Sequence, residues 1–180
     1  MKRLITSAVC LMLTIVLTAC GVPAAKGNSS RENKLDEAFE SEVGFSLEKL
    51  DADGTICRYG DGEWSVEFDS PNTLSGVKLE FSEGEVNASY KGLEFSVPQS
   101  ALPVKAMMLN LMEAVDSTAK LEKLCGEEKE SGLELTGTLE SGEYSITVDG
   151  EGRLKCFEMP NYKLKIDFRQ PSDTSTKSEE

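Results

Sequence analysis

The sequence contains no histidine, and its basic residues are much scarcer than its acidic ones. Without imidazole, Ser-His-Asp and Cys-His catalysis and every imidazole metal site are excluded. Lys and Arg number 19 against 32 Asp and Glu, and the resulting net charge of -13 repels nucleic-acid phosphates. We therefore expect no nucleic-acid partner. Apolar residues make up 39% and charged residues 28% of the 180 positions, which is typical of one ordinary globular domain.

The N-terminal segment lacks an apolar run long enough to span a bilayer. Lys2 and Arg3 precede a short apolar stretch, Ser7–Leu17, which ends in Leu17-Thr18-Ala19-Cys20. This arrangement resembles the bacterial lipoprotein signal, in which an aliphatic residue and small residues precede an obligatory cysteine. The resemblance implies cleavage before Cys20 and attachment of a diacylglycerol to its thiol. The alternative is an ordinary secretory signal with a chance cysteine.

These features divide the chain into four parts. We expect a signal peptide over 1–19, a lipidated flexible tether over 20–34, a folded domain over 35–169 and a disordered tail over 170–180. Two acyl chains hold a protein stably on a membrane. The expected location is the extracytoplasmic face of the cell membrane, with the lipid anchor as the membrane contact. An acidic body is repelled by anionic lipids and should stand off the surface on its tether.

The body is dominated by alternation of apolar and polar residues with period 2, which predicts strands with one buried face. The strands predicted in this way cover 43–47, 56–59, 64–68, 77–81, 86–90, 93–97, 133–139, 144–148, 154–156 and 162–168.

Two-residue turn signals predict how several strands pair. Turns at Glu83-Gly84 and Lys91-Gly92 place Phe81 opposite Val86 and Tyr90 opposite Leu93. A turn at Ser141-Gly142 places Leu139 opposite Tyr144.

A turn at Asp61-Gly62 places Cys57 opposite Val66, and Cys156 is expected opposite Ile146, so both thiols should point inward. Val148 is expected opposite Leu154, which requires a bulge at the Asp149–Gly152 loop. A second bulge or a change of face is expected near Lys155.

One segment has helical spacing. The apolar residues of Ser100–Leu124 recur every three to four positions, with Ser100 as the expected cap and Cys125-Gly126 as the end. A weaker helical piece is expected over 34–42.

The widths of these elements constrain the fold. About eight to ten strands at roughly 4.8 Å spacing make a sheet near 40 Å across. A helix is only about 10 to 12 Å wide. One helix cannot cover so wide a flat sheet, so the sheet must curl around it. The expected class is α+β, mostly β: a curled antiparallel half-barrel wrapped around one main helix. An apolar groove left beside the helix would mark a binding site.

Three stretches resemble the LolA/LolB-like half-barrel lipoprotein carriers of bacterial envelopes: Val66–Pro71, Ser75–Leu79 and Tyr90–Leu93. The resemblance covers 35–169. It implies a sheet wrapped over an apolar cavity that holds acyl chains. Relatives of this fold include carriers, envelope sensors and lipid-anchored partners in sporulation and germination. This chain departs from the pattern in having one strong helix and no partner-docking motif.

The residues expected on the inner face are the candidates for an apolar cavity, with simple core packing as the alternative. They are Trp64, Val66, Phe68, Leu79, Phe81, Tyr90, Phe95, Met107, Met108, Leu111, Ile146, Leu164 and Ile166. We expect no catalytic residue, metal or cofactor, because the carboxylate clusters lie in predicted loops or on wet faces.

Cys57, Cys125 and Cys156 are expected as reduced thiols, with a Cys125–Cys156 bridge as the alternative. Two functions remain open. One is a non-enzymatic lipoprotein that binds a lipid or another apolar ligand. The other is a structural or regulatory module that binds another envelope protein.

Overall fold

The computed structural model describes residues 28–102 and 106–169. The expected signal peptide, Cys20 and the expected tail lie outside these described residues. The strands are β1 (Asn28–Glu32), β2 (Phe39–Leu47), β3 (Leu50–Gly60), β4 (Glu63–Ser70), β5 (Lys78–Ser82), β6 (Glu85–Tyr90), β7 (Leu93–Pro98), β8 (Lys123–Lys129), β9 (Gly132–Leu139), β10 (Gly142–Val148), β11 (Leu154–Met159) and β12 (Leu164–Arg169). The helices are η2 (Gln99–Ala101), α2 (Met107–Ala119) and η3 (Pro160–Tyr162).

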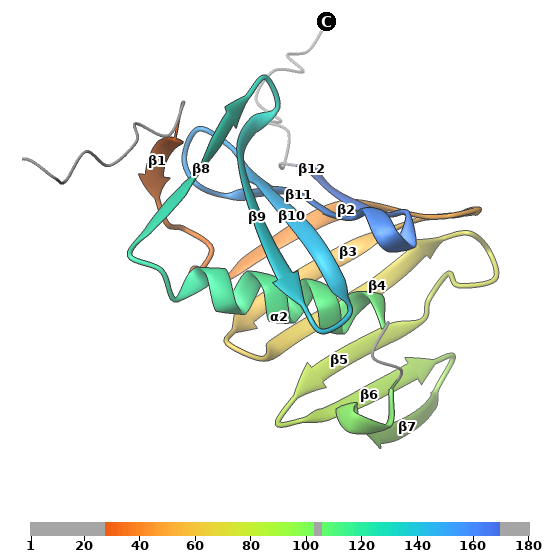
Figure 1. Cartoon of the computed structure of the whole chain (residues 1–180). Helices are drawn as coiled ribbons and strands as arrows, with labels where there is room; N and C mark the ends of the chain where they lie inside the picture. The colour runs from red at the N-terminus through yellow and green to blue at the C-terminus, as the bar shows by residue number, and fades with distance from the viewer. Residues whose placement is uncertain (1–27, 103–105, 170–180) are drawn as a thin grey trace, which may run out of the picture.

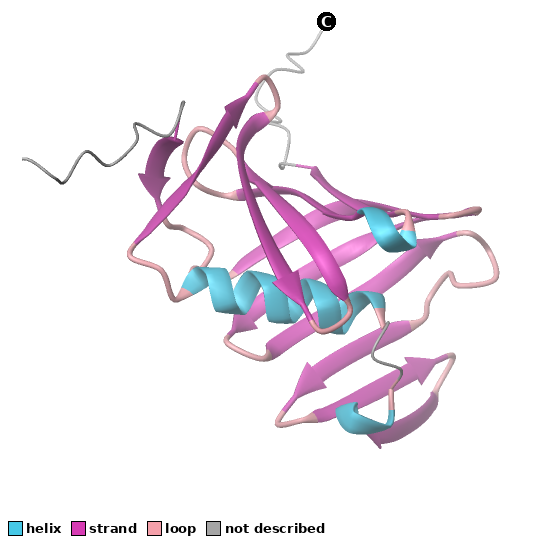
Figure 2. Cartoon of the chain, viewed as in Figure 1, coloured by secondary structure: helices cyan, strands magenta, loops and turns pink. Residues whose placement is uncertain are grey.

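All these strands form one antiparallel sheet in the order β1-β8-β9-β10-β11-β12-β2-β3-β4-β5-β6-β7. The sheet curls around α2 without closing, so β1 and β7 are its two edges (Figure 1). Figure 2 shows α2 as the long helix within this curl. The predicted class, α+β and mostly β with a curled antiparallel sheet, is confirmed.

Within the described residues the sheet has 12 strands, two more than the largest number expected, and both additional strands come from polar segments. β1 occupies 28–32, inside the expected tether, and pairs with β8, so the predicted flexible tether is wrong from Asn28 onward. β8 covers the end of the expected helix and part of a predicted acidic loop. Both strands lack apolar alternation, and Leu124 is the buried side chain of β8. Their pairing depends on backbone hydrogen bonds, which period-2 patterning does not report.

The helix is shorter than its periodicity predicted. α2 spans Met107–Ala119, and its N-cap is Ala106, which makes no side-chain cap bond, so the expected Ser100 cap is wrong. The apolar spacing continues past the helix because Leu124 is buried from β8 instead. The expected helix over 34–42 is also wrong, since β2 begins at Phe39. In the part of the chain that the structure describes, no helix combines the length and the hydropathy needed to cross a membrane.

Of the four predicted hairpin registers, two are confirmed and two are wrong. Phe81 lies opposite Val86, and Tyr90 lies opposite Leu93. In the β9–β10 hairpin, Gly142 pairs with Leu139, so Tyr144 lies opposite Gly137 and not opposite Leu139. A Cβ built at Gly137 would lie 2.4 Å from Tyr144 Cζ. The tyrosine ring occupies the space that glycine leaves open, and this pairing selects the observed register.

A bulge changes the faces of β3. The register shifts between Arg58 and Gly60, so Arg58 lies opposite Trp64 and Cys57 lies opposite Ser65. A shift of one residue turns a strand's side chains to the other face. The prediction that Cys57 points inward opposite Val66 is therefore wrong, and Arg58 is buried in its place.

The expected bulge near Lys155 is present, and Val148 lies opposite Leu154 as predicted. The extra residue turns Phe157 inward opposite Ile146, and both are fully buried. Cys156 lies opposite Thr147, so its predicted inward position opposite Ile146 is wrong.

The core lies between α2 and the inner face of the sheet. α2 contributes Met108, Leu111, Met112 and Val115, which recur at helical spacing and are buried. The strands contribute apolar residues at alternate positions, and all of them belong to one continuous cluster.

Candidate functional site

The residues predicted to line an apolar cavity fall into three groups by burial. Most are packed in the core with little or no exposure: Trp64, Val66, Phe68, Phe81, Met108, Leu111, Ile146, Leu164 and Ile166. Leu79 and Met107 are half-buried against the same core, and Tyr90 is half-buried as well. Phe95 is 63% exposed. The structure thus brings the first group together as core and leaves Phe95 accessible on the far strand.

Phe95 lies on the last of three strands, β5, β6 and β7, which we call the distal arm. Figure 1 shows these three strands at one end of the sheet, beyond the curl that holds α2. Val66 of β4 pairs with Leu79, Leu79 with Ala88, and Ala88 with Phe95, so these four side chains form one row on the inner face.

Burial in this row is lost at its last strand, β7, whereas Leu79 is half-buried. Val66 is fully buried and Ala88 is 6% exposed, whereas Phe95 is 63% exposed. In the next row Leu93, opposite Tyr90, is 72% exposed. The face that forms the core elsewhere is therefore uncovered at β7.

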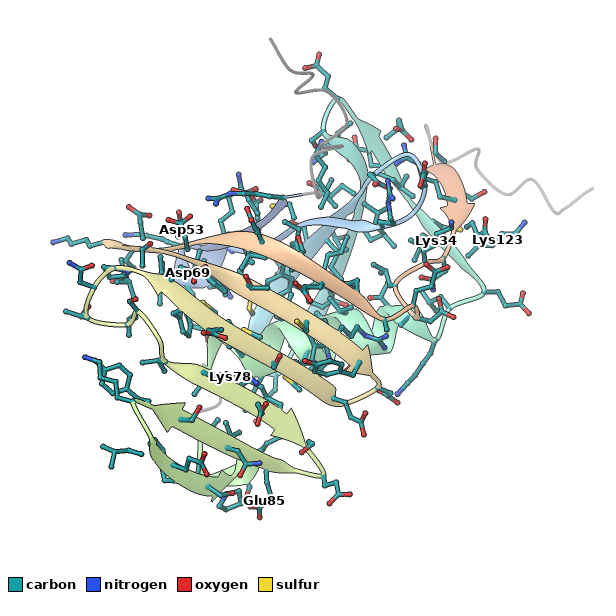
Figure 3. The ribbon with its side chains drawn as sticks, turned by 180° about the vertical axis from the view of Figure 1, so that it is seen from behind. Lys34, Asp53, Asp69, Lys78, Glu85 and Lys123 are labelled. Carbon is teal, nitrogen blue, oxygen red and sulfur yellow. The ribbon has the colours of Figure 1, made fainter. Side chains whose placement is uncertain are left out.

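The two faces of the distal arm differ sharply in polarity. The inner face carries the apolar residues Leu79, Phe81, Val86, Ala88, Tyr90, Leu93, Phe95 and Val97. The outer face carries polar and charged residues, among them Lys78, which donates to Glu80 at 2.6 Å. Figure 3 shows the molecule from behind, with Lys78 and Asp69 among the charged side chains of the outer face. Side-chain alternation separates the two faces.

The end of the inner face carries one cation. Lys91, in the turn between β6 and β7, lies 4.9 Å from the centroid of the Tyr90 ring. The Tyr90 hydroxyl raises the pKa of the Lys91 amine above its usual value, so this amine is charged at neutral pH. An apolar surface with a cation at its end suits an acyl chain joined to an anionic headgroup.

A second feature is a buried ion pair that sequence reasoning missed. Arg58 Nε donates to Asp116 Oδ1 at 3.0 Å, and Arg58 Nη2 lies 2.9 Å from the same oxygen. Trp64 Nε1 and the Gly62 amide donate to Asp116 Oδ2 at 3.0 and 2.9 Å. Arg58 also donates to the Asp36 carbonyl at 2.8 Å. These bonds join α2 to β3 and β4, so the pair holds the helix against the sheet.

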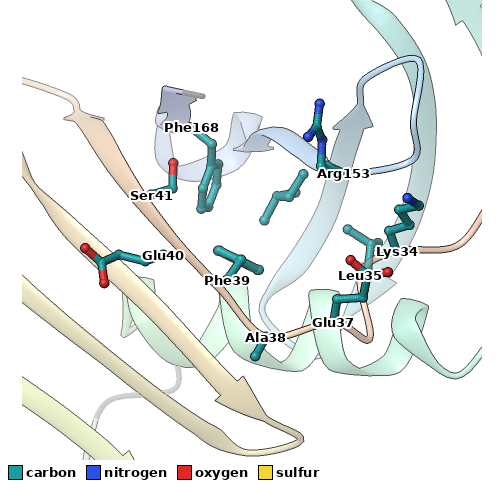
Figure 4. Close-up of a pocket in the computed structure, with 10 residues that line it drawn as sticks. Lys34, Leu35, Glu37, Ala38, Phe39, Glu40, Ser41, Arg153 and Phe168 are labelled. Atoms are coloured by element: carbon teal, nitrogen blue, oxygen red, sulfur yellow. The ribbon is translucent and has the colours of Figure 1, made fainter. Parts of the chain in front are cut away.

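A small cavity lies where the chain enters β2 (Figure 4). Leu35, Phe39, Leu154 and Phe168 form its apolar part, and the cavity holds about 80 Å³. The Phe39 ring packs edge-on against Phe168, with centroids 6.1 Å apart. Pockets for organic ligands have volumes of about 300 to 1,000 Å³, so this cavity is too small for an acyl chain.

A buried amide lies between α2 and the β9–β10 turn. Asn110 Oδ1 accepts a hydrogen bond from Ser141 Oγ at 2.8 Å, and Tyr162 donates to the Ser141 carbonyl at 2.6 Å. Asn110 Nδ2 has no partner within the described residues. The contact fixes the turn against the helix.

The three cysteines of the described ranges are free thiols, so the alternative of a Cys125–Cys156 bridge is not present in the structure. Cys125 is exposed on β8. Burial raises the pKa of Cys156 to about 12, and the nearby carboxylates of Asp167 and Glu158 raise it as well. In the part of the chain that the structure describes, no group of three His, Cys, Asp or Glu side chains could hold a metal ion.

Comparisons with known proteins give a likeness in fold to solved structures. No protein family matches the chain, and no curated protein matches it. A solved structure described as an uncharacterized conserved protein from Thermus thermophilus aligns with 77% of this chain and 88% of its own. Its TM-score is 0.48 and its sequence identity is 15%.

Proposed function

We propose that the chain is a non-catalytic lipoprotein, anchored on the extracytoplasmic face of the membrane, that binds the acyl chain of a lipid on the inner face of the distal arm. The observation that carries this proposal is the exposure of Leu93 and Phe95 on the face that is core elsewhere. Contiguous exposed apolar surface of this kind usually marks an interaction site. The resemblance to LolA/LolB-like carriers supports an acyl ligand.

The energetics favour an apolar occupant. Burying one leucine or phenylalanine side chain that was exposed contributes about 1.5 to 3 kcal/mol. The inner face of the distal arm offers no charged side chain to select a polar ligand, and Lys91 lies at its end. An acyl chain along the face with an anionic headgroup near Lys91 satisfies both features.

The anchor is proposed at Cys20. Asn28, the first residue of β1, lies eight positions after Cys20, and a chain of that length reaches at most about 28 Å when fully extended. Such an anchor holds the body close to the lipid that supplies the ligand. Cys20→Ala should move the protein from the membrane fraction to the soluble fraction or leave it unprocessed, as fractionation and the mass of the mature chain would report.

Uptake of a fluorescent fatty acid by the purified full-length protein tests the binding site. We expect binding by the unaltered protein and at least a tenfold loss, roughly 1.4 kcal/mol, in the double variant Leu93→Ser, Phe95→Ser. Leu121→Ser is the matched control, because Leu121 is 51% exposed and lies outside the distal arm. Equal uptake by all three proteins would contradict the proposal.

The second candidate is an interaction module that binds another envelope protein. The observation that favours it is the packing of the core, where most of the predicted cavity residues are buried. This candidate predicts no fatty-acid uptake and a single partner in crosslinking through the distal arm. Leu93→Ser, Phe95→Ser would then abolish the crosslink.

A further inference from the structure

We infer that β7 is a pairing edge for a second copy of this chain, which would join two molecules through an antiparallel β7–β7 contact. This inference goes beyond the proposed function and does not rest on it. Within the described residues, β7 pairs with β6 on one side, and no strand pairs with its other side. An open edge presents backbone donors and acceptors to another strand.

The β6–β7 turn fixes which backbone groups are free. Lys91 and Gly92 both have positive φ, 49° and 83°, as in the two-residue turns that close tight hairpins. The flanking pair, Tyr90 and Leu93, is then hydrogen-bonded, and such pairs alternate along the ladder. The N–H and C=O groups of Glu94 and Ser96 therefore point away from β6.

A twofold axis at Phe95 satisfies these free groups. Glu94 of one copy then lies opposite Ser96 of the other, and the two such pairs exchange four backbone hydrogen bonds. Phe95 of one copy packs against Phe95 of the other, and Leu93 of each copy lies opposite Val97 of the other. A shift of two residues would instead place the apolar Leu93 opposite the polar Gln99.

Charge and composition also fit a second copy. β7 contains one charged residue, Glu94, which in this register faces the neutral Ser96. Edge strands that avoid pairing carry lysine or central proline, whereas the one proline of β7, Pro98, is at its end. Pairing would also bring the exposed side chains of Leu93 and Phe95 from both copies onto one shared apolar face.

Ser96→Pro tests the contact without disturbing the β6–β7 ladder, because the lost N–H points away from β6. The full-length protein, purified in mild detergent, would be studied by sedimentation over a wide concentration range. We expect a dimer whose dissociation constant rises about tenfold or more in Ser96→Pro, since two of the four bonds are lost. Ser96→Ala, which keeps the N–H, should leave it unchanged.

A disulfide tests the register. In a Cys125→Ser background, Phe95→Cys should give a crosslinked dimer on mild oxidation, because the two Cβ atoms meet across the axis. Leu121→Cys in the same background is the control and should not crosslink. A protein that is monomeric at every concentration, or a dimer that Ser96→Pro leaves unchanged, would overturn the inference. Fatty-acid uptake is a separate measurement, so failure of either proposal can be distinguished from failure of the other.

Discussion

Asp116 is the side chain on which the helix–sheet contact depends. Its carboxylate accepts hydrogen bonds from Arg58, Trp64 and the Gly62 amide, and both members of the ion pair are buried. Removing one member of a buried ion pair leaves the other charge unpaired, which costs more than the pair contributes.

Asp116→Leu alone or Arg58→Met alone should therefore lower the free energy of unfolding by about 3 to 5 kcal/mol, whereas the double variant Arg58→Met, Asp116→Leu should lose much less. Urea unfolding of the single variants and the double variant measures this coupling. Additive losses would show that the pair does not act as a unit.

The cysteines differ in reactivity because they differ in burial. Cys125 is exposed, whereas the pKa of Cys156 is raised to about 12 by burial and by neighbouring carboxylates. The thiolate is the reactive form, so Cys156 is almost wholly unreactive at neutral pH.

Iodoacetamide at neutral pH should label Cys125 rapidly and Cys156 slowly, by at least about a hundredfold in rate, since the thiolate fraction falls tenfold for each unit of pKa. Peptide mass spectrometry over time measures both rates in one sample, and denatured protein is the control. Equal labelling of the two thiols in the folded protein would contradict the burial of Cys156.

Single residues also explain which sequence predictions failed. The alternation of Trp64, Val66 and Phe68 predicted β4 correctly, and the Glu83-Gly84 and Lys91-Gly92 turns predicted their registers. The Asp61-Gly62 turn could not reveal the bulge after Arg58, because a bulge adds a residue without changing the turn sequence. The same bulge turns Arg58 inward, so the turn sequence could not reveal its buried pair with Asp116 either.

At the scale of elements, the missed strands are those with no apolar signal. β1 and β8 pair through backbone groups, and Gly126 lets β8 approach β9 closely: a Cβ there would lie 2.1 Å from the Glu134 carbonyl oxygen. Glycine at such a site reflects close approach of two backbones. The uncovered face of the distal arm was also beyond prediction, since alternation does not report where the helix ends.

Gly126→Ala should displace β8 and lower the free energy of unfolding by about 1 to 3 kcal/mol. Gly150→Ala is the matched control, because a Cβ at Gly150 meets nothing within 4 Å, and it should be close to neutral. Thermal unfolding of both variants measures the difference, and equal melting temperatures would contradict the close approach at β8.

Across the whole molecule, the protection of backbone amides against hydrogen exchange is expected to be uneven. The central strands β2, β3 and β4 carry fully buried residues such as Val43, Ile56 and Trp64, whereas β7 has no buried residue. Regions with little buried apolar surface open more readily than the rest of a fold.

Hydrogen exchange should therefore be faster in the peptide amides of β6 and β7 than in those of β3 and β4, by tenfold or more, roughly 1.4 kcal/mol of opening free energy. Exchange mass spectrometry at low protein concentration measures this in the monomer. Higher concentration should slow exchange at Glu94 and Ser96 if β7 pairs with a second copy. Uniform protection of all four strands would contradict the difference in burial.

The position of β12 determines when the sheet can form during folding. β12 joins β2 through pairs such as Phe168 with Val43, so residues from the two ends of the described chain meet in the middle of the sheet. Contacts between such distant parts of a sequence slow folding, because a long loop must close first. A nascent chain whose residue Phe168 has not yet left the ribosome cannot complete the described sheet. Loss of β12 would therefore separate β11 from β2 in the middle of the sheet, whereas loss of β7 would remove only an edge strand.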